Sequence, residues 1–119
     1  MCMGTIVMAN IRKLRIAARD GYCGAAHYCR DDPYIASKKV KVDFEKGLLE
    51  TVQLTLQAYW EFSRCDGKKN RVTEQFRLDN PFAVAVAKQF YESQYLDLCM
   101  QQKVPFSEVF NKIAARFFG

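Results

Sequence analysis

Apolar and polar side chains alternate strictly in the middle of the chain. From Thr51 to Phe62 every even position is apolar, and the odd positions are polar except for the amphipathic Tyr59. A period of two is typical of a strand that has one face on a core and the other face in water. The pattern therefore predicts a long strand over residues 51–62, with Trp60 in its buried row.

Two flanking segments repeat the alternation and predict neighbouring strands. Residues 39–44 carry apolar side chains at the even positions, and residues 71–78 alternate in a similar way. The second segment follows Cys65–Asn70, a run with turn chemistry whose Asp-Gly pair favours positive φ. Successive strands joined by short turns are typical of a meander, so the three segments predict a three-stranded antiparallel sheet.

The first 38 residues have a weaker pattern. Residues 12–18 fit a strand or a helix, and the alternation of basic and apolar side chains from Lys13 to Ile16 favours a strand, which would be the fourth of the sheet. Glycines, an Asp-Asp-Pro sequence and mixed polarity predict a long loop over residues 20–37. Residues 1–9 are interpreted as a flexible or misassigned start, with Met8 as the alternative initiator.

Two helices are predicted at the C-terminal end. Asn80 followed by Pro81 indicates a helix start, because Asn caps helices and Pro is tolerated at the first helical position. Apolar side chains then fall in one arc of a helix that runs to about Gln102. Pro105 ends this helix, and Ser107 begins a last amphipathic helix. The predicted fold class is α+β, a three- or four-stranded antiparallel sheet with the two helices packed on one face.

Composition narrows the class of protein without naming its function. Half of the 119 residues are hydrophobic and 26% are charged, which excludes intrinsic disorder and suits one domain spanning 1–119. No apolar run approaches the ~18 residues of a membrane-spanning helix, so we expect no membrane partner. The net charge of +5 is concentrated in the first 44 residues, which carry eight Lys or Arg against four Asp or Glu. Such a bias suits nucleic-acid phosphates or an acidic protein surface.

The five cysteines have irregular spacing, which makes a poor disulfide framework and favours a reducing cytoplasm. Cys23, His27 and Cys29 form a cluster with metal-ligand or nucleophile chemistry. However, Cys-x3-His-x-Cys is not a spacing that structural zinc sites favour, and the sequence identifies no orienting group for a Cys–His pair. We therefore predict no metal, no cofactor and no catalytic residue, and we interpret the cluster as loop packing.

The outward row of the predicted sheet is basic and rich in hydrogen-bonding side chains. Lys13 and Arg15 join this row if residues 12–18 form a strand. A solvated sheet face that protects its edges with lysine would have the same composition. The predicted partner-binding residues are Lys39, Lys41, Gln53, Tyr59, Lys68, Lys69, Arg71 and Arg77.

These observations favour a non-enzymatic cytoplasmic protein that regulates or inhibits a macromolecular partner by occupying its surface. The expected partner is a protein or nucleoprotein complex with an acidic surface, and compact chains of this kind are common among phage and mobile-element inhibitors. The alternative is a DNA- or RNA-binding protein that uses the basic sheet face, although single-strand binders present more stacking aromatics. An enzyme or zinc protein built on Cys23, His27 and Cys29 is the least favoured hypothesis. The sequence determines neither the oligomeric state nor the identity of the partner.

Overall fold

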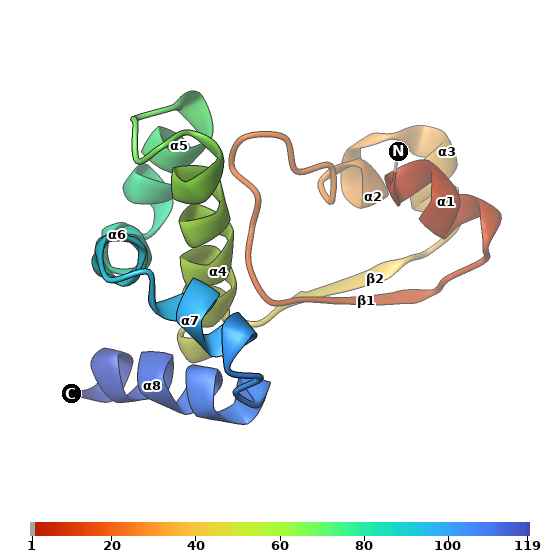
Figure 1. Cartoon of the computed structure of the whole chain (residues 1–119). Coiled ribbons are helices and arrows are strands. Elements are labelled where there is room, and N and C mark those ends of the chain that lie inside the picture. The colour runs from red at the N-terminus through yellow and green to blue at the C-terminus, as the bar shows by residue number, and fades with distance from the viewer. Residues whose placement is uncertain (1) are drawn as a thin grey trace.

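The chain folds into two structurally different regions (Figure 1). The computed structural model describes residues 2–119. We call residues 2–46 the N-terminal lobe and residues 48–119 the helical part. The lobe contains α1 (Cys2–Met8), β1 (Lys13–Ile16), α2 (Tyr28–Asp31), α3 (Pro33–Ser37) and β2 (Lys41–Phe44). The helical part contains α4 (Leu48–Arg64), α5 (Arg71–Asp79), α6 (Pro81–Glu92), α7 (Tyr95–Gln101) and α8 (Phe106–Phe118).

The predicted α+β fold with an antiparallel meander is wrong. Among residues 2–119 the sheet has two strands, β1 and β2, and they pair in parallel with Lys13 opposite Lys41 and Ile16 opposite Phe44. Strands are confirmed at Lys13–Ile16 and within 39–44, but their pairing is not the predicted one. A parallel pair needs a crossover connection, and residues 17–40 provide it. The loop predicted over 20–37 accordingly holds the short helices α2 and α3.

The segment with the strictest alternation is the helix α4, not a strand. Its buried side chains recur at intervals of three and four, which is the periodicity of one helical face. Thr55 fits this face because its hydroxyl donates to the carbonyl oxygen of Thr51 at 2.7 Å, so its polarity is satisfied inside the core. Trp60, which the strand prediction placed inside, is 60% exposed. The buried residues of α4 are Thr51, Val52, Leu54, Thr55, Ala58, Tyr59, Glu61 and Phe62.

The predicted third strand, 71–78, is also a helix, α5. The carbonyl oxygen of the Asn70 side chain accepts from the Thr73 N–H at 2.9 Å, and the Thr73 hydroxyl oxygen accepts from the Asn70 N–H at 3.3 Å. This reciprocal capping box starts a helix where the sequence suggested the end of a hairpin turn. The turn itself is confirmed, since Asp66 and Gly67 both have positive φ.

The helices predicted after Asn80 agree better with the structure. Asn80 caps α6 by accepting from the Ala83 N–H at 3.1 Å. The helix predicted to reach Gln102 is interrupted after Glu92, where Gln94 adopts a left-handed conformation with φ of 51° before α7 begins. The last helix is confirmed as α8.

Nearly all of the buried apolar side chains belong to the helical part. Of the 15 buried hydrophobic residues within 2–119, Val40 is the one contributed by the lobe. The lobe is joined to the helical part through Gly47 and through the loop after β1. In this loop Gly21 lies so close to α5 that an added Cβ would clash with the side chains of Asp79 and Gln75. No helix within residues 2–119 is both long enough and apolar enough to cross a membrane.

Candidate functional site

The outer face of the two-stranded sheet is the part of the lobe that gathers unpaired positive charge. Side chains alternate across a strand, so the apolar Leu14 and Val42 point to one face and Lys13, Arg15 and Lys41 point to the other. We call Lys13, Arg15 and Lys41 the basic face. All three residues are exposed.

One acidic side chain lies on the same face. The Lys13 Nζ is 3.9 Å from the Asp43 carboxylate, and both side chains are largely solvated. An exposed pair of this kind is weak. Within the part of the chain that the structure describes, Arg15 and Lys41 have no acidic partner within ion-pair distance. The face therefore presents a surplus of cations to solvent.

Two further cations stand where the strands begin. The Arg12 guanidinium donates to the carbonyl oxygen of Lys38 at 3.2 Å, which ties together the chain segments leading into β1 and β2. Lys39 is exposed and adopts a φ of 53° just before β2. The positive charge thus continues from the basic face to one end of the sheet.

The backbone at the outer edge of β1 is free to bond with another chain. Lys41 donates its N–H to the carbonyl oxygen of Arg12, and Glu45 donates to that of Ile16. Alternate residues of a parallel strand bond to the neighbouring strand. In this register the N–H and carbonyl groups of Lys13 and Arg15 therefore point away from β2. No backbone hydrogen bond from residues 2–119 reaches those groups, so β1 presents an open edge.

The residues predicted to form a single binding face are dispersed by the fold. Lys39 and Lys41 lie in the lobe, whereas Gln53, Tyr59 and Arg77 lie on helices of the helical part (Figure 1). Lys68 and Lys69 lie in the turn that connects α4 to α5, and Arg71 is the first residue of α5. A single eight-residue surface was predicted because helices α4 and α5 were taken for strands.

Two of these residues have other partners. Tyr59 is buried, and its hydroxyl donates to the Asp97 carboxylate at 2.6 Å. Burial and this hydrogen bond raise the pKa of Tyr59 to about 12. Arg77 forms an ion pair with Glu74 on the same helix. Lys13 and Arg15, which were conditional members of the predicted face, belong to the basic face that the structure assembles.

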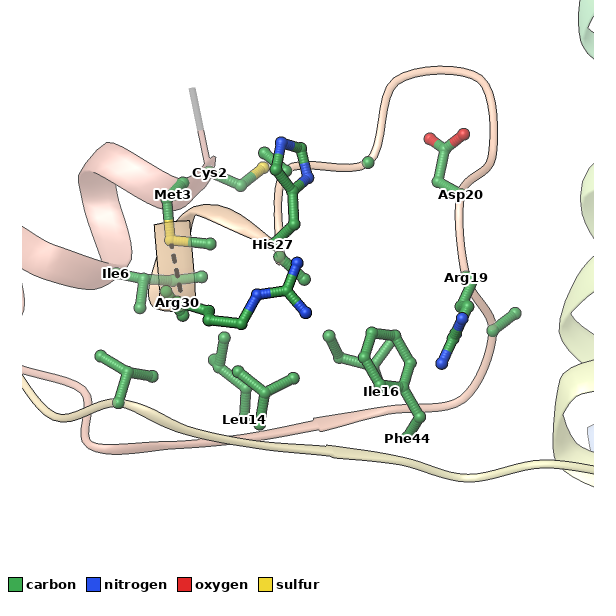
Figure 2. A pocket seen from close by; sticks show the side chains of 17 residues that line it. Cys2, Met3, Ile6, Leu14, Ile16, Arg19, Asp20, His27, Arg30 and Phe44 are labelled. Atoms are coloured by element: carbon green, nitrogen blue, oxygen red, sulfur yellow. Dashed lines mark hydrogen bonds between the residues drawn. The ribbon is translucent and has the colours of Figure 1, made fainter. Parts of the chain in front are cut away.

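The opposite face of the sheet forms the floor of a cavity of about 720 Å³ (Figure 2). The roof comes from α1 and from the segment that leads into α2. Most of the lining is apolar, and a few charged or polar side chains also contribute to it. The apolar floor residues are Leu14, Ile16, Val40, Val42 and Phe44, and the polar lining residues are Arg19, Asp20, His27 and Arg30.

The structure does not bring Cys23, His27 and Cys29 together as one centre. The Cys23 thiol donates to the Asp20 carboxylate at 3.1 Å, and this bond, together with the charge of Asp20, raises the pKa of Cys23. The His27 ring stacks against Tyr28 at 4.3 Å, and the Cys29 sulfur lies 3.8 Å from that of Met3. Within residues 2–119, no three His, Cys, Asp or Glu side chains are grouped as metal ligands.

These contacts also bear on nucleophilic chemistry at Cys23. A nucleophilic cysteine needs a stabilised thiolate, and the neighbouring carboxylate of Asp20 disfavours that form. The arrangement suits a surface loop held by hydrogen bonds rather than a Cys–His pair.

Comparison with known proteins identifies no relative: no family model, no curated protein and no solved structure matches this chain.

Proposed function

We propose that this protein is a non-enzymatic binding protein that regulates or inhibits an acidic protein partner by occupying its surface. The observation that carries the proposal is the basic face, where Arg15 and Lys41 have no acidic partner among residues 2–119 and lie beside the open edge of β1. Complementary charge steers association and selects the partner. The open edge adds backbone donors and acceptors that an extended polypeptide can pair with.

The open edge favours a protein partner over a nucleic acid. Peptide groups recognise an added strand, whereas the phosphates of DNA or RNA require cations alone or cations with stacking aromatics. The three cations of the basic face are interrupted by Asp43, which a phosphate backbone would approach unfavourably. Nucleic-acid binding through the same face is the alternative that the experiment distinguishes.

Two further observations support a non-enzymatic role in a reducing compartment. The five cysteines are all free thiols, which suits the cytoplasm. The raised pKa of Cys23 opposes its use as a nucleophile. We therefore include cytoplasmic localisation in the proposal.

The test compares two triple charge reversals on one chain. Lys13→Glu/Arg15→Glu/Lys41→Glu inverts the basic face, and Lys68→Glu/Lys69→Glu/Arg71→Glu inverts an equal charge on the helical part. Tagged wild type and both variants capture proteins from nuclease-treated host lysate, with quantification by mass spectrometry. We expect a protein retained by the wild type and the helical-part variant to be lost from the basic-face variant. Thermal melts of all three proteins control for folding.

Two results would contradict the proposal. The first is a capture experiment in which both variants retain the same proteins, or in which the wild type retains no protein. The second is a gel shift of a DNA or RNA probe that weakens steeply between 50 and 200 mM salt and disappears in the basic-face variant. That result would assign the face to nucleic acid instead.

A further inference from the structure

The cavity above the sheet leaves the apolar side of the lobe incompletely covered. Leu14, Ile16, Val42 and Phe44 are only half-buried, although they form the inner face of the sheet. Apolar area in contact with water is unfavourable, so an occupant that covers this floor would be stabilised. A volume of about 720 Å³ lies within the range of small-molecule sites.

Arg19 supplies an available cation at the edge of this floor. Its guanidinium lies 4.7 Å from the centre of the Phe44 ring, and Figure 2 shows the side chain directed toward Phe44 and Ile16. Among residues 2–119 no carboxylate forms an ion pair with it. Stacking on the ring holds the guanidinium in place while its N–H donors stay free.

Two other charged groups that line the cavity already have partners within their own segments. Arg30 donates to both carboxylate oxygens of Asp31, at 2.6 and 3.1 Å. Asp20 accepts from the thiol and N–H of Cys23 and from the N–H of Tyr22. These hydrogen bonds outweigh partial burial and lower the pKa of Asp20, so its negative charge is held within its own loop. Arg19 is thus left to attract an anion.

We infer that the cavity is a binding site for an amphipathic anion, such as a fatty acid, whose carboxylate bonds to Arg19 and whose aliphatic chain covers Leu14, Ile16 and Val42. A guanidinium recognises a carboxylate through two parallel hydrogen bonds. The apolar floor binds the aliphatic chain of the ligand because that chain becomes buried. This contribution depends on the buried apolar area and not on the detailed structure of the aliphatic chain. This site lies on the inner face of the sheet and is independent of the basic face on the outer side.

The first experiment titrates dodecanoate, below its aggregation concentration, into the protein with labelled Ile and Val methyl groups. We expect saturable shifts at Ile16, Val40 and Val42, with Val109 and Ile113 in the helical core unchanged. Decanoate is two methylenes shorter and should bind roughly fifteenfold more weakly, because each buried methylene contributes about a fourfold change in affinity. An absence of saturation, or shifts centred on the helical core, would overturn the inference.

The second experiment separates the head group from the tail. Arg19→Gln should weaken dodecanoate binding at least tenfold and leave binding of uncharged dodecanol nearly unchanged. Arg71→Gln, in the helical part, is the matched control and should change neither. An equal affinity of wild type and Arg19→Gln for dodecanoate would overturn the role of Arg19.

The third experiment removes the space itself. Ala26→Phe adds a ring at a lining position outside the helices and strands, and it should abolish binding of both probes. A melt equal to that of wild type shows that the variant folds. Methyl shifts that depend on protein concentration without added probe would show that a second copy of the chain fills the cavity, which would also overturn the inference.

Discussion

The lobe and the helical part differ in how completely they bury their apolar side chains. In the helical part, Leu54 and Ile113 are no more than 1% exposed, within a core built from α4, α6 and α8. In the lobe, Ile16 and Phe44 line an open cavity and are only partly buried. The helical part therefore contains most of the buried apolar core, and the lobe carries the two binding surfaces that we propose.

The short elements of the lobe strengthen this contrast. Helices α1, α2 and α3 have seven residues or fewer, and isolated helices of that length are unstable in water. The lobe depends on the parallel pairing of β1 with β2 and on the loop that rests on α5. Regions with few buried contacts open locally before the whole protein unfolds, and binding surfaces are drawn from such regions.

The largest effect should come from paired truncations that compare the two regions. Ile113→Ala removes a fully buried side chain and should cost about 2–5 kcal/mol of unfolding free energy. Ile16→Ala, at the partly buried floor of the cavity, should cost about 1 kcal/mol of unfolding free energy. Urea unfolding followed by helical circular dichroism measures both. Equal costs would mean that the two regions share one core.

A second prediction concerns the hydrogen bond that fixes α7 to α4. Tyr59→Phe removes the bond to Asp97 and should cost about 1.5 kcal/mol, the lower end for bonds to charged groups, because Asp97 remains accessible to water.

The same bond makes the helical part sensitive to alkaline pH. The pKa of Tyr59 is raised from 10.0 to about 12, so the unfolded chain releases this proton first. The contribution of Tyr59 is complete below pH 10 and is lost as pH rises through about 12. Denaturant midpoints between pH 9 and 12 should fall more steeply for wild type than for Tyr59→Phe. Parallel curves for the two proteins would argue against this coupling.

A third prediction tests the cap of α6. Asn80 accepts from the Ala83 N–H and donates to the Thr51 hydroxyl at 3.2 Å, so it also links α6 to α4. Asn80→Ala should cost about 1 kcal/mol. Asn111→Ala, at an exposed position within α8, is the matched control and should change the melting temperature little.

The smallest effect on the free energy of unfolding is expected for Trp60, an exposed side chain of the helical part. Trp60 is 60% exposed and lies under the Arg64 guanidinium at 5.4 Å. Trp60→Ala should cost less than about 1 kcal/mol, since exposed positions contribute little. The native protein should also show red-shifted tryptophan emission that acrylamide quenches. A blue-shifted emission would place Trp60 in a core and contradict this packing.

The misreading of α4 shows what alternation alone cannot decide. Thr51, Thr55 and Tyr59 lie in the outward row of the alternating pattern, yet all three are buried. The Thr55 hydroxyl donates to the Thr51 carbonyl, and the Tyr59 hydroxyl donates to Asp97. The Thr51 hydroxyl accepts from the Asn80 side chain, and only the folded chain provides these partners. The same alternation at Lys13–Ile16 did predict a strand, because there the polar residues are charged and remain in water.

The candidate sites were predictable only in part. The surplus of cations in the first third of the chain, with Lys41 among them, was visible in the sequence. The parallel pairing that places Lys41 beside Lys13 was not, because it depends on a crossover through weakly patterned residues. The cavity was missed as well, since its lining comes from segments distant in the sequence. Leu14 and Ile16 form an apolar row on the predicted strand, and this row indicated that other residues must pack over that face.

The parallel pairing of β1 with β2 has a consequence for how fast each region forms. Lys13 and Lys41 meet only after the long segment between them has closed, and closure of such a segment slows folding. The helices from α4 to α8 follow one another along the chain and are joined by short connections, which is typical of fast folding. When the unfolded chain refolds, the helical core should therefore form before the parallel sheet and the cavity of the lobe.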